Sequence, residues 1–222
     1  MPLPHSLRAL RHPNFRRYFI GQTISQLGSW MQSTAIMWLA YRLTNSTATT
    51  GLIGFLAMAP YIVITPLAGA LSDRISRRKL LITVLSLSAV QAALLAFFTQ
   101  TGQINIPLLG TLALLQGILN GFEVPTRHAF FVQLIDDKGD LPNAIALNSI
   151  NINSTRLIGP AIGGLLIAAV SEALCFGLNA LSYLAVLAQL IRIRPLEAAR
   201  QPTRQSLWAD LLEGWKFGLS HP

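Results

Sequence analysis

Residues 69–81 read GALSDRISRRKLL, and this run decides how the rest of the chain is interpreted. It places four cationic side chains and one carboxylate between two long apolar segments. About a quarter of the residues of a soluble domain are charged, whereas 12% of this 222-residue chain is charged and 52% is hydrophobic. A short basic run in such surroundings is typical of a loop between two membrane-spanning helices.

Six apolar stretches are each about long enough, at ~1.5 Å per residue, to cross a hydrocarbon core of about 30 Å. They cover residues 18–41, 51–72, 80–99, 107–122, 144–170 and 173–191, and the fourth is short only because Glu123 interrupts it. The period-2 alternation of a membrane β-barrel is absent. The sequence therefore predicts an all-α polytopic membrane protein with six transmembrane helices.

The basic residues predict how these helices are oriented. Fifteen of the 17 Lys and Arg residues lie before the first stretch, after the sixth, or in the loops that follow the second and the fourth. By the positive-inside rule this side is cytoplasmic, so both termini are expected there. The net charge of +8 is thus a topology signal, and nucleic acid is not an expected partner because the cations are dispersed over several loops.

The number of cations does not explain Gly69 and Asp73, because a carboxylate adds nothing to the positive-inside rule. A Gly four residues before a carboxylate at a helix end permits close approach of another helix. The run resembles the signature loop between helices two and three of the major facilitator superfamily, and the matching residues are Gly69, Leu71, Asp73, Arg74, Arg77 and Arg78. Ser76 departs from the pattern, since the family often has Gly there. The resemblance implies that Asp73 faces a helix N-terminus in the other half and latches a cytoplasmic gate.

Three more segments are similar to the branch of that superfamily that includes siderophore exporters and drug-efflux proteins. They are LRHPNFRRYFIGQTISQLGSWMQ (10–32), GFEVPTRHAFFVQLI (121–135) and LPNAIALNSININSTRLIGPAIGGLL (141–166). Members have twelve helices in two halves, so residues 1–191 are expected to form the N-terminal six-helix half-bundle. Residues 192–222 are expected to form a cytoplasmic linker and an interfacial amphipathic helix, truncated before a seventh span.

Polar residues inside the first, fourth and fifth predicted helices fall on single helix faces. Such faces avoid lipid, so they form hydrogen bonds between helices or line a cavity. The three faces together favour a cavity, because the resemblance places these helices around a central substrate site. The predicted cavity residues are Gln22, Gln26, Gln116, Asn120, Asn148 and Asn151, and aromatic and Met side chains are expected to supply its apolar wall.

Glu123 and Arg156 are the charged residues that need a partner or a function, because a charge near the bilayer centre costs about 2.5 kcal/mol or more. Glu123 is expected to pair with Arg127, one turn further on, or with Arg156 in the fifth helix. Two roles stay open: a structural ion pair, or a coupling site where Glu123 binds and releases a proton and Arg156 tunes its proton affinity.

Small residues predict where the helices touch. The expected helix-packing residues are Gly117, Gly121, Gly159, Pro160, Gly163 and Gly164, and residues 156–164 are similar to the helix-five motif of proton-coupled antiporters in the superfamily. In the loop before the fifth helix, Asp140 is expected to cap that helix.

No cofactor, metal or catalytic residue is expected. The single Cys excludes disulfides within the chain, and the sequence has no Walker loop, no metal-ligand spacing and no Gly-x-Ser-x-Gly elbow, so it predicts neither an ATP-driven pump nor an enzyme.

The sequence thus predicts half of a secondary-active transporter of the bacterial inner membrane, with small amphipathic molecules such as drugs or siderophores as its substrates. Alternating access with proton-coupled export follows from the resemblance, as does the direction of transport. Expected partners are the lipid bilayer, a small-molecule substrate, protons, and a C-terminal half or a second copy. The alternative is a non-transporting half-transporter that only binds a partner half or a ligand.

Overall fold

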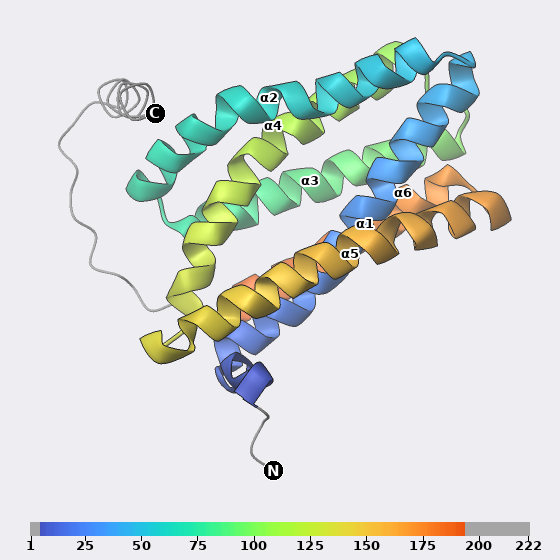
Figure 1. Cartoon of the computed structure of the whole chain (residues 1–222). Coiled ribbons are helices and arrows are strands. Elements are labelled where there is room, and N and C mark those ends of the chain that lie inside the picture. The colour runs from blue at the N-terminus through green and yellow to red at the C-terminus, as the bar shows by residue number, and fades with distance from the viewer. Residues whose placement is uncertain (1–4, 194–222) are drawn as a thin grey trace, which may run out of the picture.

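The computed structural model describes residues 5–193, except for the side chains of residues 5, 6, 70 and 72–74. Its long helices lie side by side in one bundle and alternate in direction (Figure 1). They are α1 (Pro13–Thr44), α2 (Thr47–Arg74), α3 (Arg77–Gln100), α4 (Ile106–Phe131), α5 (Leu141–Ala169) and α6 (Glu172–Arg192). Three 3-10 turns are η1 (His5–Arg11), η2 (Val132–Leu134) and η3 (Lys138–Asp140). The described residues form no strand, so the all-α prediction is confirmed. The predicted linker and interfacial helix lie almost wholly outside the described residues.

The tight turns at one end of the bundle follow from local sequence. Ser46, Asn105 and Ser171 precede α2, α4 and α6, and the side chain of each accepts a hydrogen bond from the backbone N–H three residues on. Asn45 ends α1 with φ of 50°, the left-handed conformation that Asn tolerates better than most residues. These caps let each pair of helices reverse direction within a few residues (right-hand end of Figure 1).

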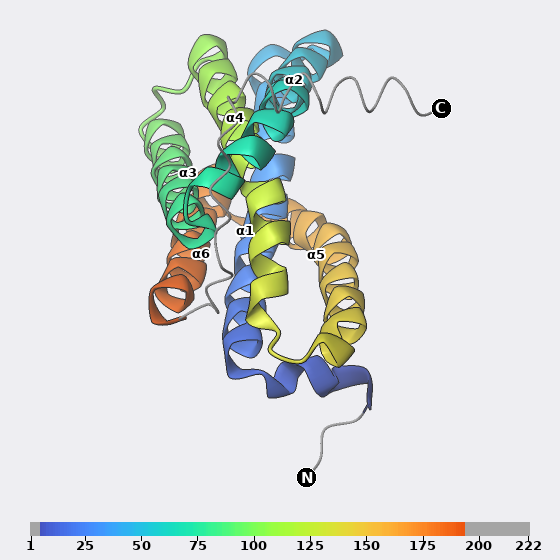
Figure 2. The same cartoon turned by 90° about the vertical axis from the view of Figure 1, so that its left-hand side faces the viewer.

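Helix α1 lies in the middle of the bundle. It packs against α6, α5 and α2, while α2 packs on α4, and α3 packs on α6 and α4. Figure 2 shows α1 between α5 on one side and α6 on the other. Two large apolar clusters fill the bundle, one around Phe15, Phe130 and Tyr183, and the other around Leu39, Leu109 and Phe176, and a small third one lies around Leu80, Val84 and Leu119.

Five of the long helices have the length and hydropathy of a membrane span, and α1 is not among them. The polarity of α1 has a structural reason: Gln22, Gln26 and Gln32 are all buried, with exposed fractions of 3%, 9% and 2%. A polar side chain is tolerated at membrane depth when other helices shield it from lipid. The central position of α1 provides that shielding.

Helix α4 approaches α2 closely at the two predicted glycines. A Cβ atom at Gly117 would lie 2.5 Å from the carbonyl oxygen of Ala57, and one at Gly121 would lie 2.7 Å from the side chain of Ile64. Both distances are shorter than a van der Waals contact, so only glycine fits at this spacing.

Helix α5 approaches α1 in the same manner. A Cβ atom at Gly159 would lie 2.5 Å from Trp30 Cβ, and one at Gly163 would lie 3.1 Å from the backbone of Met31. Pro160 lies inside α5 between them. For Gly164 the structure differs from the prediction, because a Cβ atom there would meet nothing within 4 Å. Its position next to Gly163 turns it away from α1. Gly69 of α2 has the same open surroundings.

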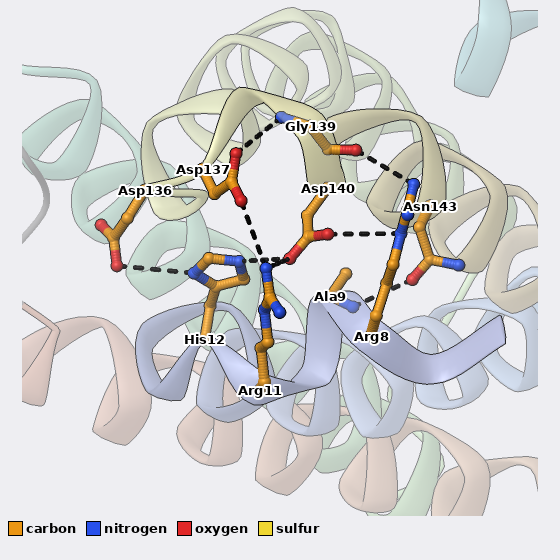
Figure 3. A network of polar contacts seen from close by, with 9 residues as sticks. All are labelled: Arg8, Ala9, Arg11, His12, Asp136, Asp137, Gly139, Asp140 and Asn143. Carbon is orange, nitrogen blue, oxygen red and sulfur yellow. Dashed lines mark hydrogen bonds and ion pairs between the residues drawn. The ribbon is translucent and has the colours of Figure 1, made fainter. Parts of the chain in front are cut away.

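A group of charged side chains ties the N-terminal segment to the loop between α4 and α5 (Figure 3). We call it the charged clasp, and it consists of Arg8, Arg11, His12, Asp136, Asp137 and Asp140. The Asp140 carboxylate lies 3.2 Å from Arg8 Nε, 2.8 Å from Arg11 Nη2 and 2.9 Å from His12 Nε2. Two bonds to the backbone reinforce the clasp: Arg8 donates to the Gly139 carbonyl at 3.0 Å, and the Ala9 N–H donates to Asn143 Oδ1 at 2.9 Å.

The role of Asp140 differs from the predicted one. It stands at the N-cap position of α5, but its side chain makes no capping hydrogen bond. Pro142 in the first turn lacks one of the N–H donors that a cap would satisfy, and the backbone of Asp140 is helical rather than extended. The carboxylate therefore turns to the N-terminal segment, a contact between residues more than 120 positions apart that local sequence does not encode.

Candidate functional site

A cavity of about 500 Å³ lies between α1, α2 and α4. Its polar lining residues are Gln22, Ser25, Gln26, Ser29, Asn120, Glu123 and Arg127, and its apolar ones are Trp30, Phe55, Ala57, Met58, Ala59, Tyr61, Ile62, Val124 and Ile152. A pocket of this size with an aromatic wall and a few convergent polar groups is typical of a small-molecule site. Ile152 is the one lining residue from α5.

The predicted cavity residues divide into two groups. Gln22, Gln26 and Asn120 line the cavity, whereas Gln116, Asn148 and Asn151 do not. Gln116 Nε2 donates to Asn120 Oδ1 at 2.8 Å, and Asn151 Nδ2 donates to Gln26 Oε1 at 2.9 Å. Gln116 and Asn151 therefore form hydrogen bonds to lining residues without facing the cavity themselves. The polar face of each helix is wider than the part of it that lines the cavity.

A buried amide network behind the cavity includes residues that the sequence pattern did not single out. Gln32 Nε2 donates to Gln91 Oε1 at 3.1 Å and to Gln116 Oε1 at 3.2 Å, and Asn179 Nδ2 donates to Gln32 Oε1 at 2.9 Å. The network joins α1, α3, α4 and α6. Lone amides in otherwise apolar stretches are the signal for such contacts, and each contributes about 0.6 kcal/mol within a membrane.

The charged end of the cavity contains Glu123 and Arg127. Their side chains are 11% and 13% exposed, and Arg127 Nη1 lies 3.6 Å from Glu123 Oε1, which is too long for a hydrogen bond. Two more polar atoms nearby on α1, Tyr18 Oη and Gln22 Oε1, are buried and have no hydrogen-bond partner among the described residues. Buried polar groups are nearly always satisfied in native proteins. This end of the cavity therefore has unused hydrogen-bonding capacity.

Arg156 is not the partner of Glu123, although the sequence left that pairing open beside the one with Arg127. Of the two possible partners of Glu123, the structure pairs it with Arg127, whereas the Arg156 guanidinium lies over the Trp30 ring at 5.7 Å from the ring centroid. A cation–π contact contributes about 0.5–2 kcal/mol, and a charge at the centre of a membrane helix costs about 2.5–3.5 kcal/mol even on insertion scales. The contact with Trp30 thus offsets only part of that cost.

The predicted gate residues lie at the end of the bundle opposite the tight turns. Arg77 Nη1 donates to the Ala129 carbonyl at 3.1 Å, and Arg78 donates to the carbonyls of Leu190 and Ile191, both at 2.7 Å. These cations hold the last turns of α4 and α6, where the helix dipole favours positive charge. Leu71 packs against Leu80, Val84 and Leu119. The side chains of Asp73 and Arg74 lie outside the described residues.

The fold and the cavity together define a class: a multi-pass membrane protein built as one half-bundle of the major facilitator type. Comparison with protein families agrees with this. Residues 5–221 match the transmembrane secretion effector family, and the chain belongs to this family of major facilitator proteins.

Several curated proteins are similar to the chain. The staphyloferrin A transporter of Staphylococcus aureus is 29% identical over 75% of this chain and 42% of its own length. The enterobactin exporter EntS of Shigella boydii is 28% identical over 95% of this chain and 50% of its own length. The uncharacterised transporter YfiS of Bacillus subtilis is 30% identical over 72% of this chain and 37% of its own length. The chain thus spans about half, or less, of the length of these relatives.

Proposed function

We propose that the chain is the N-terminal half of a secondary-active exporter of small amphipathic molecules such as siderophores or drugs. The observation that carries this proposal is the cavity of about 500 Å³, whose wall combines aromatic and Met side chains with amides and one ion pair. The names of two relatives, a staphyloferrin A transporter and an enterobactin exporter, support this substrate range. The proposed location is the bacterial inner membrane, with both termini in the cytoplasm.

Alternating access needs a second bundle that closes the cavity from the other side. The exposure of the helices supports α2 and α5 as the surface for it: 11% and 17% of their apolar windows are buried, against 44% for α3, α4 and α6. Phe55, Met58 and Ile62 of α2 line the cavity and are also 65%, 74% and 77% exposed. The C-terminal half of the transporter, or a second copy of the chain, would cover them.

Glu123 is the proposed proton-coupling residue. It is the only acidic residue among those that line the cavity, and its ion pair with Arg127 at 3.6 Å is loose enough to open when the carboxylate takes up a proton. A carboxylate that alternates between a charged, paired form and a neutral form is a means of coupling proton movement to a change in conformation.

Asp73 is the proposed gate residue. Asp73 is the next-to-last residue of α2, four residues before Arg77, which with Arg78 forms the basic pair in the first turn of α3. We expect Asp73→Asn to cripple turnover while insertion and stability stay unchanged, because the gate would lose its charge–dipole contact with the other half. Transport rate measured against the amount of inserted protein tests this, and full activity of the variant would remove the gate role.

The alternative is a half-transporter that binds a partner half or a ligand without transporting. The two functions are separated by efflux from cells that express residues 1–222 alone or the full reading frame, with and without collapse of the proton gradient. A fluorescent amphipathic dye and an iron-free siderophore serve as substrates. Export only with an intact gradient supports the exporter. The absence of export under all conditions, from a chain shown to be inserted, supports the alternative.

A further inference from the structure

Arg156 takes part in no ion pair among the described residues, and the proposed proton coupling does not involve it. It lies near the middle of α5 (Leu141–Ala169), roughly 20 Å from either end at ~1.5 Å per residue. A side chain at that depth cannot reach the headgroup region, which long cations near helix ends do. The ion pairs among the described residues involve Arg8, Arg11, His12, Arg42 and Arg127, but not Arg156.

The position of Arg156 connects it with the cavity. It follows Ile152 by one helical turn, and Ile152 lines the cavity. Its guanidinium lies 5.7 Å from the centroid of Trp30, and Trp30 belongs to the same lining. Gly159, one turn further on, allows the close approach of α5 to Trp30 that this contact requires. The residue is also exposed, so one side of the guanidinium is open.

The charges around the cavity do not cancel. Glu123 and Arg127 neutralise each other, which leaves the positive charge of Arg156 as the net charge of the described lining and its immediate neighbour. Gln22 Oε1 and Tyr18 Oη add unused hydrogen-bonding capacity. A planar guanidinium presents donors that bind a carboxylate with two hydrogen bonds.

We propose that Arg156 is a specificity-determining residue that selects ligands with an anionic group, such as a carboxylate, next to a flat apolar part that contacts Trp30. The anionic group of the ligand provides the ion-pair partner that Arg156 does not have among the described residues, and the aromatic wall of the cavity binds the apolar part. This inference rests on the proposed role of the cavity as the substrate site, and it names the charge of the substrate.

The test uses the protein expressed from its full reading frame, in lipid nanodiscs, with Trp30 as the optical reporter. Trp38, Trp208 and Trp215 are replaced by Phe, since the 222 residues contain four Trp, and any Trp encoded beyond them is replaced as well. Energy transfer from Trp30 to an anthracene probe reports binding. The probes share one ring system and differ in charge: 2-anthracenecarboxylate, 2-anthracenecarboxamide and 2-(aminomethyl)anthracene.

We expect the carboxylate to bind about tenfold more tightly than the amide, and the amine to bind most weakly. Arg156→Gln should remove this preference and leave amide binding unchanged, whereas Arg156→Lys should keep most of it because the charge remains. Arg192→Gln, which removes an exposed cation at the end of α6, is the matched control and should bind all three probes like the parent.

Four outcomes overturn the proposal. Equal binding of carboxylate and amide by the parent removes the charge selectivity, and unchanged carboxylate binding by Arg156→Gln assigns it to other residues. An equal loss of all probes in Arg156→Gln shows a structural role. Failure of every probe to bind the parent contradicts the cavity as a ligand site, and thereby the proposed function as well.

Discussion

The charged clasp and the charged end of the cavity are both built from Arg and acidic residues, but they differ in how tightly the charges are held. In the clasp, the Asp140 side chain is 4% exposed and has the guanidinium groups of Arg8 and Arg11 and the imidazole of His12 within 3.2 Å. In the cavity, Glu123 has one ion-pair partner among the described residues, Arg127, at 3.6 Å. A saturated carboxylate stabilises one conformation, whereas a loosely paired one can change its charge or partner. On this basis we propose a structural role for the clasp and a functional role for the charged end of the cavity.

Neutralising the Glu123 carboxylate should have the largest effect on activity. We expect Glu123→Gln to abolish gradient-dependent efflux, because an amide cannot exchange the proton, while the thermal stability changes little since the ion pair with Arg127 is long. Dye efflux at equal protein levels measures the activity, and thermal unfolding in detergent measures the stability. A loss of folding in Glu123→Gln, restored when Arg127 is also neutralised, would instead show that the pair is structural.

Disturbing the cavity wall tests whether packing, rather than charge, holds that region together. Gly117→Ala places a Cβ atom 2.5 Å from the Ala57 carbonyl, in the segment of α2 that lines the cavity. We expect a loss of about 1–3 kcal/mol from the forced separation of α2 and α4. Gly164→Ala is the control and should cost nothing measurable, because no atom lies within 4 Å of the added Cβ. Equal stabilities in thermal unfolding would contradict the close approach of α4 to α2.

Breaking the clasp should affect stability without altering transport chemistry. We expect Asp140→Asn to lower the unfolding temperature by several degrees, because Arg8, Arg11 and His12 lose their shared buried anion. The coupling ratio of protons to substrate should stay unchanged in the protein that remains folded. A change in that ratio at unchanged stability would place the clasp in the transport cycle.

The smallest effect is expected at the rim of the clasp. Asp137 pairs with Arg11 at 3.2 Å, but its side chain is 58% exposed, so water screens the pair. We expect Asp137→Asn to shift the unfolding temperature by less than the error of a thermal-unfolding measurement. A shift as large as that of Asp140→Asn would mean that the clasp acts as one unit rather than through its buried carboxylate.

Local sequence patterns account for the helices and for part of the site. Apolar stretches mark the positions of the six long helices, although α1 is not among the five with the hydropathy of a membrane span, and the polar-face residues Gln22, Gln26 and Asn120 line the cavity. The same spacing cannot separate them from Gln116 and Asn151, which lie on the same helix faces but contact the lining from behind. The pairing of Glu123 also stayed open, because both candidate arginines are compatible with the helix pattern.

The sequence by itself determined that the chain crosses the membrane as helices, because the number of consecutive apolar residues fixes what a bilayer accepts. Only the tertiary structure decided that α1 occupies the centre, that Asp140 binds the N-terminal segment, and that Arg156 lies over Trp30. These features depend on contacts between residues more than 100 positions apart, and the spacing of residues along one helix carries no information about them. Packing of the helices brings these charges into place, and it thereby decides which of them are available to a ligand.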